Sequence, residues 1–488
     1  MSNFRRPAAT LLRLALALAP GMVLAAEGRP EAGTGLPGGA TLGGAERSGG
    51  LAPLSELGAG KAAIGAGRQV IVQGQLDLDV LQHDNYTDGD GGQSDSRGYG
   101  TMRAELGLNV KLDERAQVVI AFGYRADLGD YGTNNRREEL PATPGPDSSQ
   151  FNSAQSQVVL KDAFVNLKEF LGFEELGVIA GRMPVSWFLV NDRGAFLFDS
   201  RADDPAIGSW DGARASYSGW DVMLLSPWVY RLPDASTLWG VTLDWKPATA
   251  GGDRVLVTAT YAEQRNAILP QNLTAEKLQT VSGGLDWRSG ELGFWVEAAG
   301  QKGNGLGGVT FEGFGGETGL DWQFSQYGKG RFQIIGGYQT GDDPGSSGSF
   351  EGFVNEWETI GDTLIVEHEK YGELSELMVG NLMSIKARWG IGFDERDSVR
   401  LDLTAAHYVM HEPIVAGGDT SFGTEFDAAL RWQYTYNAQI RLFGALFKPG
   451  DGLADAQEAS AAAATPPRTI TAGDDMIWLM GANLNVSF

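Results

Sequence analysis

Apolar residues recur at every second position along the chain from residue 69 onward. In the final segment one face is apolar and the other is small or polar, the apolar set being Trp478, Met480, Ala482, Leu484, Val486 and Phe488. Residues 99–112 repeat this alternation, with Arg103, Glu105 and Lys111 on the polar face. Because a period of two residues is the pattern of a β-strand, we expect an all-β protein.

The alternating segments predict eighteen strands, an even number. Connections after the even-numbered strands are tight, as at 113–116 and 289–290, whereas those after odd-numbered strands are mostly long and rich in Gly, Asp or Pro. The predicted strands are 69–81, 99–112, 117–128, 156–168, 176–186, 209–217, 220–228, 236–246, 254–263, 277–288, 291–301, 311–324, 331–340, 377–389, 398–408, 423–434, 438–447 and 476–488.

Alternation alone does not distinguish a soluble sandwich from a membrane barrel. The even strand number and the short and long connections on opposite ends are typical of outer-membrane barrels. Aromatic residues also cluster near strand ends, as interfacial girdles require, and the chain closes on Phe488. Because lipid offers no partner to an unpaired sheet edge, we expect one closed antiparallel transmembrane barrel with an aqueous lumen.

Composition and charge limit the kinds of partner and the class of protein. The formal net charge is -24 and the sequence pI is about 4.6, which opposes binding to nucleic acid. The mean hydropathy of -0.18 excludes a polytopic helical membrane protein, and the absence of cysteine excludes disulfides and thiolate metal sites. We expect no cofactor.

Three regions are predicted along the chain. Residues 1–26 read as a signal peptide, with arginines before an apolar run and small residues at the cleavage site, although a single anchor helix is the alternative. Residues 27–68 are Gly- and Ala-rich and are expected to form a mobile or weakly helical periplasmic tail. Residues 69–488 would then form the barrel.

Propagating the alternation places charges of both signs inside the lumen. Acids such as Asp162 and Asp402 share that face with the arginines. These side chains either contact a hydrophilic substrate or pair with each other across the wall. The candidate pore-lining cations from this pattern are Arg103, Arg125, Arg182, Arg214, Arg288, Arg331, Arg388, Arg400, Arg431 and Arg441.

Three connections stand out. Residues 129–155 contain several prolines and either fold inward as a constriction or form an ordinary exposed loop. Residues 341–376 carry ten acids and are expected to form a solvated acidic cap. Residues 448–475 are alanine-rich, and we expect them to be mobile.

The segment 441–451, Arg-Leu-Phe-Gly-Ala-Leu-Phe-Lys-Pro-Gly-Asp, follows Glu425-Phe426-Asp427 on the preceding predicted strand. This hairpin resembles the penultimate hairpin of the alginate export family, and Gly181-Arg182 and Asp211-Gly212-Ala213-Arg214 are weaker similarities. The resemblance implies an eighteen-stranded outer-membrane exporter of an anionic polysaccharide. It also implies a basic path that includes Arg182, Arg441 and Lys448, with Glu425 and Asp427 as wall partners.

These observations favour a passive outer-membrane channel of the alginate-export type for an exopolysaccharide or another hydrophilic, anionic solute. The alternatives are a general or sugar- or anion-selective diffusion porin, and a barrel that sheathes an electron conduit. An enzyme is not expected, because the other three histidines fall in predicted outer loops and no serine is placed to pair with His407. The expected partners are outer-membrane lipid and lipopolysaccharide, the barrel-assembly machinery and, for an exporter, a periplasmic polysaccharide-export scaffold.

Overall fold

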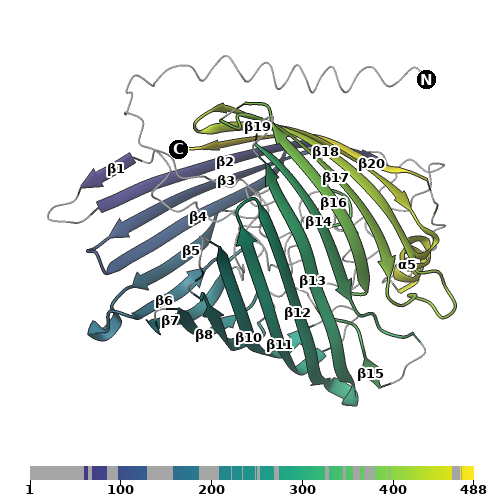
Figure 1. Cartoon of the computed structure of the whole chain (residues 1–488), viewed down its shortest axis with the longest axis horizontal. Helices are drawn as coiled ribbons and strands as arrows, with labels where there is room; N and C mark the ends of the chain where they lie inside the picture. Colours follow the sequence, from purple (N-terminus) through teal and green to yellow (C-terminus); the bar gives the residue numbers. More distant parts are fainter. Residues whose placement is uncertain are drawn as a thin grey trace. The chain divides into compact units, whose positions relative to one another are not determined.

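The computed structural model describes residues 60–63, 69–84, 97–128, 158–185, 208–220, 222–233, 235–247, 249, 253–268, 274–324, 329–344, 348–354, 363–367, 374, 380–394, 396–463, 473 and 475–488. These ranges are almost entirely β-strand (Figure 1). None of the helices that they contain is long and apolar enough to cross a membrane. The predicted signal peptide and the 129–155 connection lie outside these ranges.

Eighteen long strands form the wall of the barrel. They are β2 (Gln69–Asp84), β3 (Arg97–Lys111), β4 (Ala116–Leu128), β5 (Val158–Leu167), β6 (Leu176–Met183), β7 (Trp210–Trp220), β8 (Met223–Arg231), β9 (Thr237–Trp245), β10 (Arg254–Ile268), β11 (Thr274–Ser289), β12 (Leu292–Gly305), β13 (Thr310–Phe324), β14 (Gly330–Gln339), β16 (Leu382–Gly392), β17 (Val399–Met410), β18 (Ser421–Thr435), β19 (Ala438–Pro449) and β20 (Ile477–Ser487). Each matches a predicted strand.

The strands pair antiparallel in chain order, and the sheet closes on itself. β14 pairs with β16, and β20 returns to β2 with Leu76 opposite Val486. Phe488 is fixed there by reciprocal backbone hydrogen bonds with Gly74, N···O 2.8 and 2.9 Å. Closure pairs every edge of the sheet, as a bilayer requires. The predicted eighteen-stranded antiparallel barrel is confirmed.

Two short strands join this ring. β1 (Gly60–Ala63) pairs antiparallel with the first residues of β2, so part of the predicted tail is a strand, and β15 (Ser349–Phe350) pairs parallel with β13. Within the described ranges, the helical elements are the single turns η2 (Phe170–Gly172) and η5 (Leu306–Gly308) and the helix α5 (Asp451–Ala463). The helix α5 lies in the alanine-rich segment that was expected to be mobile.

The barrel has two unlike ends. We call the end with the tight turns the turn end; it holds residues 112–115 and 290–291, the start of β2 and the end of β20. The opposite end, which holds the connection between β14 and β16 and helix α5, is the loop end (Figure 1). In outer-membrane barrels short turns face the periplasm and long loops face outward.

Candidate functional site

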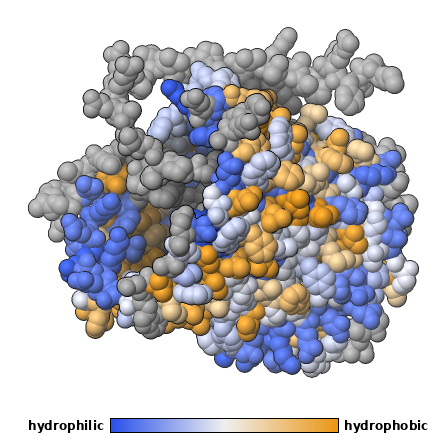
Figure 2. All heavy atoms as spheres, viewed as in Figure 1, coloured by the Kyte–Doolittle hydropathy of each residue, from blue (hydrophilic) through white to orange (hydrophobic). Residues whose placement is uncertain are grey.

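The two faces of the wall differ in exposure. On β12, Leu292 is 54% exposed, whereas Trp295 and Glu297 on the alternate face are 2% and 5% exposed. The exposed face is apolar and forms an orange area over the front strands in Figure 2. The buried face carries ion pairs between strands and is covered in places by the connection between β14 and β16. It is therefore the inner wall of the lumen.

Three arginines stand side by side on the inner wall. Arg400 on β17 is opposite Arg431 on β18, and Arg431 is opposite Arg441 on β19. We call these three residues the arginine row. Like charges directly opposite each other on neighbouring strands destabilise a sheet, so this arrangement needs compensating groups or a function.

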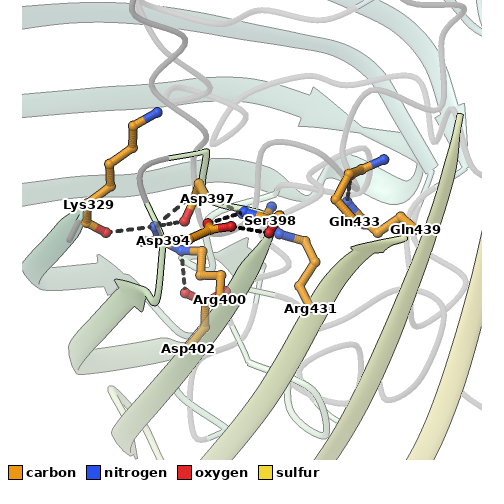
Figure 3. A network of polar contacts seen from close by, with 9 residues as sticks. All are labelled: Lys329, Asp394, Asp397, Ser398, Arg400, Asp402, Arg431, Gln433 and Gln439. Carbon is orange, nitrogen blue, oxygen red and sulfur yellow. Dashed lines mark hydrogen bonds and ion pairs between the residues drawn. The ribbon is translucent and has the colours of Figure 1, made fainter. Parts of the chain in front are cut away.

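Two aspartates compensate part of the row (Figure 3). Arg400 Nε donates to Asp402 Oδ1 at 2.7 Å, and Asp397 accepts from both Arg400 Nη1 and Arg431 Nη2 at 3.4 Å. The guanidinium of Arg441 lies 5.1 Å from the ring centroid of Phe443. Asp397 reaches the two arginines from the turn after β16, where its φ of 57° is a conformation that Asp tolerates.

A second cluster repeats this arrangement on β11, β13 and β14. The Asp321 carboxylate accepts hydrogen bonds from Arg288 Nη2 at 2.6 Å and from Arg331 Nε at 2.8 Å. One carboxylate therefore pairs with two guanidiniums. Each arginine of the two clusters lies within four positions of the turn end of its strand. We call the five together the arginine rim: Arg288, Arg331, Arg400, Arg431 and Arg441.

Nearer the middle of β2 and β3, charges pair across the wall. Arg103 Nη2 lies 3.3 Å from Asp77, and Lys161 Nζ lies 2.7 Å from Glu105. Asn483 on β20 donates to Asp77 at 2.6 Å, which links the last strand to the first. These groups are almost fully buried and paired with one another, so they stabilise the closure of the barrel.

The connection between β14 and β16 enters the lumen. Ile365 and Val366 donate backbone N–H groups to Glu425 at 2.6 and 3.0 Å, and Leu364 donates to Asp427 at 3.2 Å. These loop residues are at most 4% exposed. We call residues 363–367 the inserted segment. The expectation of a solvated acidic cap over 341–376 was wrong for these residues.

An apolar cluster holds the inserted segment against β17–β20. Tyr408, Phe422 and Phe447 from the wall pack with its Leu364, Ile365 and Val366 and with Leu453 of α5. Gly423, with a φ of 149°, allows this packing, because a Cβ there would lie 2.4 Å from the Phe447 ring. Lys386 on β16 adds an ion pair to Glu367 at 2.8 Å.

A second part of the same connection contacts another sector of the wall. Gln301 on β12 exchanges two hydrogen bonds with the backbone of Val354, at 2.7 and 2.8 Å. Phe353 belongs to an apolar cluster with Trp210, Trp228 and Tyr230. The connection is thus fixed to the inner wall at two places, and it narrows the lumen there.

Eleven of the thirteen predicted site residues lie on the inner face. Glu425 and Asp427 bind the inserted segment, so they are anchors for the loop and not partners of a basic path. The inward cations are Arg103, Arg125, Arg214, Arg288, Arg331, Arg388, Arg400, Arg431 and Arg441.

Arg182 and Lys448 face outward, so the prediction that they line the pore was wrong. Arg182 donates from Nε and Nη2 to the two carboxylate oxygens of Asp211 at 2.9 Å, and the next residue, Met183, packs inward. Lys448 follows the inward Phe447 and is exposed. Both lie beside apolar clusters that fill the lumen, where the inner face carries apolar residues.

The described residues offer no metal site, because they contain no group of three His, Asp or Glu side chains able to hold an ion. His407 faces outward, and its Nδ1 lies 2.9 Å from Thr424 Oγ1. His411 Nδ1 accepts the Gly341 N–H at 3.3 Å. The candidate functional site is therefore the charged lumen, defined by the arginine rim and the inserted segment.

The sequence profile of the alginate export family matches residues 108–465, more than half of the chain. No curated protein sequence gives a significant match. Among solved structures, OpdO of Pseudomonas aeruginosa is similar with a TM-score of 0.51 at 11% identity, over 86% of this chain and 97% of OpdO.

A BenF-like porin from Pseudomonas fluorescens Pf-5 gives a TM-score of 0.51 at 9% identity, over 86% of this chain and 98% of that one. OpdK of Pseudomonas aeruginosa, solved with vanillate, gives a TM-score of 0.50 at 10% identity, over 86% of this chain and 98% of OpdK. At these identities the likeness extends to the fold alone.

Proposed function

Because this chain belongs to the alginate export family and has a porin-like fold, we propose that it is a passive outer-membrane channel for anionic solutes, an acidic polysaccharide foremost. The protein is located in the bacterial outer membrane. Its family and fold are those of channels and not of enzymes. The turn end then faces the periplasm.

The arginine rim carries the proposal. Five guanidiniums gather on the inner wall at the periplasmic mouth, and Asp321 and Asp397 each serve two of them. A guanidinium fork binds carboxylates in a bidentate manner, and adjacent forks allow a polymer to pass from one to the next. Because a narrow pore screens charge less than bulk water, the rim lowers the barrier for anions that enter from the periplasm.

The inserted segment supports a second candidate, a diffusion porin for small carboxylates. This segment and helix α5 fill the lumen beside β17–β20 with apolar side chains. A lumen narrowed in this way admits small anions more easily than a polymer. The two candidates share the arginine rim and differ in the size of the solute.

Blockade in planar bilayers tests the proposal. We expect an acidic oligouronate, added on the periplasmic side, to interrupt the ion current at concentrations far below those of a neutral oligoglucan of equal length. The matched variants replace Arg400 and Arg431 with Gln, and the control replaces the outward Arg182 with Gln. Equal blockade by the acidic and neutral oligomers would contradict an anionic cargo, and blockade by benzoate alone would favour the small-solute porin.

A further inference from the structure

Charged side chains project from the outer face of the barrel at the loop end of β6–β13. This face meets lipid, where Lys and Arg are costly at the bilayer midplane and tolerated near its boundaries. The cations are Arg182, Arg231, Arg265, Lys277 and Lys302, which we call the basic belt. In a chain with a formal charge of -24, five cations on one outer surface need an explanation.

Strand register aligns the belt. Asp211 is opposite both Arg182 and Arg231, and Arg231 is opposite Thr237 on β9. Thr237 is in turn opposite Arg265, and Arg265 is opposite Lys277. One continuous line of outward residues therefore runs across β6–β11. The next line toward the turn end contains Lys302, opposite Gln279 on β11.

Apolar side chains mark the lipid boundary directly beneath the belt. Val229, Trp239, Val281 and Phe314 lie next to it toward the turn end, and all four are exposed. Figure 2 shows hydrophilic residues along the lower edge of the front strands, below the hydrophobic area. The belt thus lies at the level where lipid acyl chains give way to headgroups.

The cations are held in position and remain accessible. Glu263, 3% exposed, accepts from Arg265 Nε at 2.7 Å and lies 3.3 Å from Lys277 Nζ. The Arg265 and Lys277 side chains are nevertheless 58% and 41% exposed, and that of Lys302 is 79% exposed. Glu263 thus holds both charged groups in ion pairs on the outer face and leaves a large part of each side chain accessible.

The belt occupies one side of the barrel only. On β14 and β16–β20, the described outward residues near the loop end include Tyr338, Met383 and Val409. Lys448 is the one lysine or arginine among them. A general preference for charge at a membrane boundary would act on both sides, so this asymmetry indicates a specific ligand.

We propose that the basic belt binds the phosphate groups of lipopolysaccharide in the outer leaflet. Phosphates carry several acceptor oxygens and high negative charge, which arginine forks and lysine ammonium groups recognise. The height of the belt matches the headgroups of the lipid that surrounds this face. Three acids pair with the belt and orient the cations that meet the phosphates: Asp211, Glu263 and Glu312.

Binding of lipid A to the detergent-solubilised full chain tests this proposal. We compare diphosphoryl lipid A with chemically dephosphorylated lipid A by native mass spectrometry and by the thermal shift of the folded barrel. The parent protein should retain diphosphoryl lipid A and lose most affinity for the dephosphorylated form. Inorganic phosphate alone should give no thermal shift, because binding depends on a lipid at the membrane boundary.

The belt variant combines Arg231→Gln, Lys277→Gln and Lys302→Gln. We expect it to bind diphosphoryl lipid A roughly a hundredfold more weakly, since each cation near an anionic surface contributes about fivefold. The matched control, Lys168→Gln, Arg396→Gln and Lys448→Gln, removes three cations elsewhere and should bind as the parent does.

Two results would overturn the proposal. The first is equal retention of phosphorylated and dephosphorylated lipid A by the parent, which needs no variant to fold. The second is a belt variant that keeps its lipid A affinity but loses a chemically cross-linked oligomer, which would assign the belt to a contact between barrels. Cargo transport does not enter either measurement, so the result is independent of the proposed channel function.

Discussion

At the residue scale, the arginine row combines electrostatic repulsion between its guanidiniums with the ability to attract anions. Three guanidiniums on neighbouring strands repel each other, and Asp397 and Asp402 relieve part of that repulsion (Figure 3). A wall built for stability alone would alternate the charges, as Asp77 and Arg103 do on β2 and β3. The arginine row is therefore the part of the inner wall that stabilises a passing anion most.

Asp394 organises the turn that carries Asp397. Its carboxylate accepts the Ser398 backbone N–H at 2.6 Å and also accepts from the Ser398 hydroxyl. These hydrogen bonds hold the pKa of Asp394 below its usual value. A carboxyl group with a lowered pKa in the folded state stabilises the turn above the unfolded pKa of about 3.9, and that stabilisation is lost as pH falls through the lower folded pKa.

We therefore predict a pH-dependent turn. Hydrogen exchange at the Ser398 amide, corrected for the intrinsic rate, should stay slow down to about pH 4 and accelerate below it. In Asp394→Asn the same amide should exchange faster at neutral pH and show no such step. Identical protection of the parent and the variant at pH 7 would contradict this role for Asp394.

Residue positions on the wall were predictable where the inner face is polar. Alternation placed Arg400, Arg431 and Arg441 inside correctly, because polar residues face water there. It failed at Arg182, and the resemblance failed at Lys448, because the inner face beside them packs against apolar residues of the lumen. Periodicity cannot detect this, since it depends on which loop enters the barrel.

At the element scale, the inserted segment determines how wide the lumen is. The backbone N–H groups of Leu364, Ile365 and Val366 donate hydrogen bonds to Glu425 and Asp427. A hydrogen bond to a charged group contributes about 1.5–3 kcal/mol. The segment is thus attached to the wall by a few strong contacts and an apolar cluster.

We predict that Glu425→Gln loosens this attachment. The amide offers one acceptor oxygen in place of two, and each 1.36 kcal/mol lost changes a population ratio about tenfold. Single-channel recordings should show at least about a tenfold longer total time in a high-conductance state. Glu114→Gln, at an exposed turn, is the matched control, and unchanged recordings for Glu425→Gln would refute an anchoring role.

The strands were predicted far better than the connections. All eighteen follow from period-two alternation, because the wall residues experience the same two environments along the whole barrel. The ten acids of 341–376 concealed the apolar run Leu364–Val366, which is the signal that could have indicated an inserted segment. Helix α5 was missed for a similar reason, since Leu453 and Ala456 are buried in a segment whose composition indicated mobility.

At the scale of the whole molecule, the two ends of the barrel differ in exposure to the cell. An epitope inserted after Asp343, exposed at the loop end, should be labelled by antibody on intact cells. An epitope after Glu114, in the exposed turn between β3 and β4, should be labelled only after the outer membrane is permeabilised. Surface labelling at Glu114 would reverse the orientation and move the arginine rim to the outside.

With this orientation, charge is distributed by function across the molecule. The arginine rim lies on the inner wall at the periplasmic mouth, where an exported anion would enter. The basic belt lies on the outer face at the opposite end, where lipid headgroups are. The paired charges of β2, β3 and β20 lie between them and stabilise closure.

We expect the arginine row to select anions, and a reversal potential measures this selectivity. In planar bilayers under a tenfold KCl gradient, the parent should favour chloride. Arg400→Gln, Arg431→Gln and Arg441→Gln combined should shift the reversal potential toward potassium by a sizeable fraction of the limit of about 59 mV, while the outward control Arg182→Gln leaves it in place. A folded triple variant with the reversal potential of the parent would show that these arginines only stabilise the wall and do not select anions.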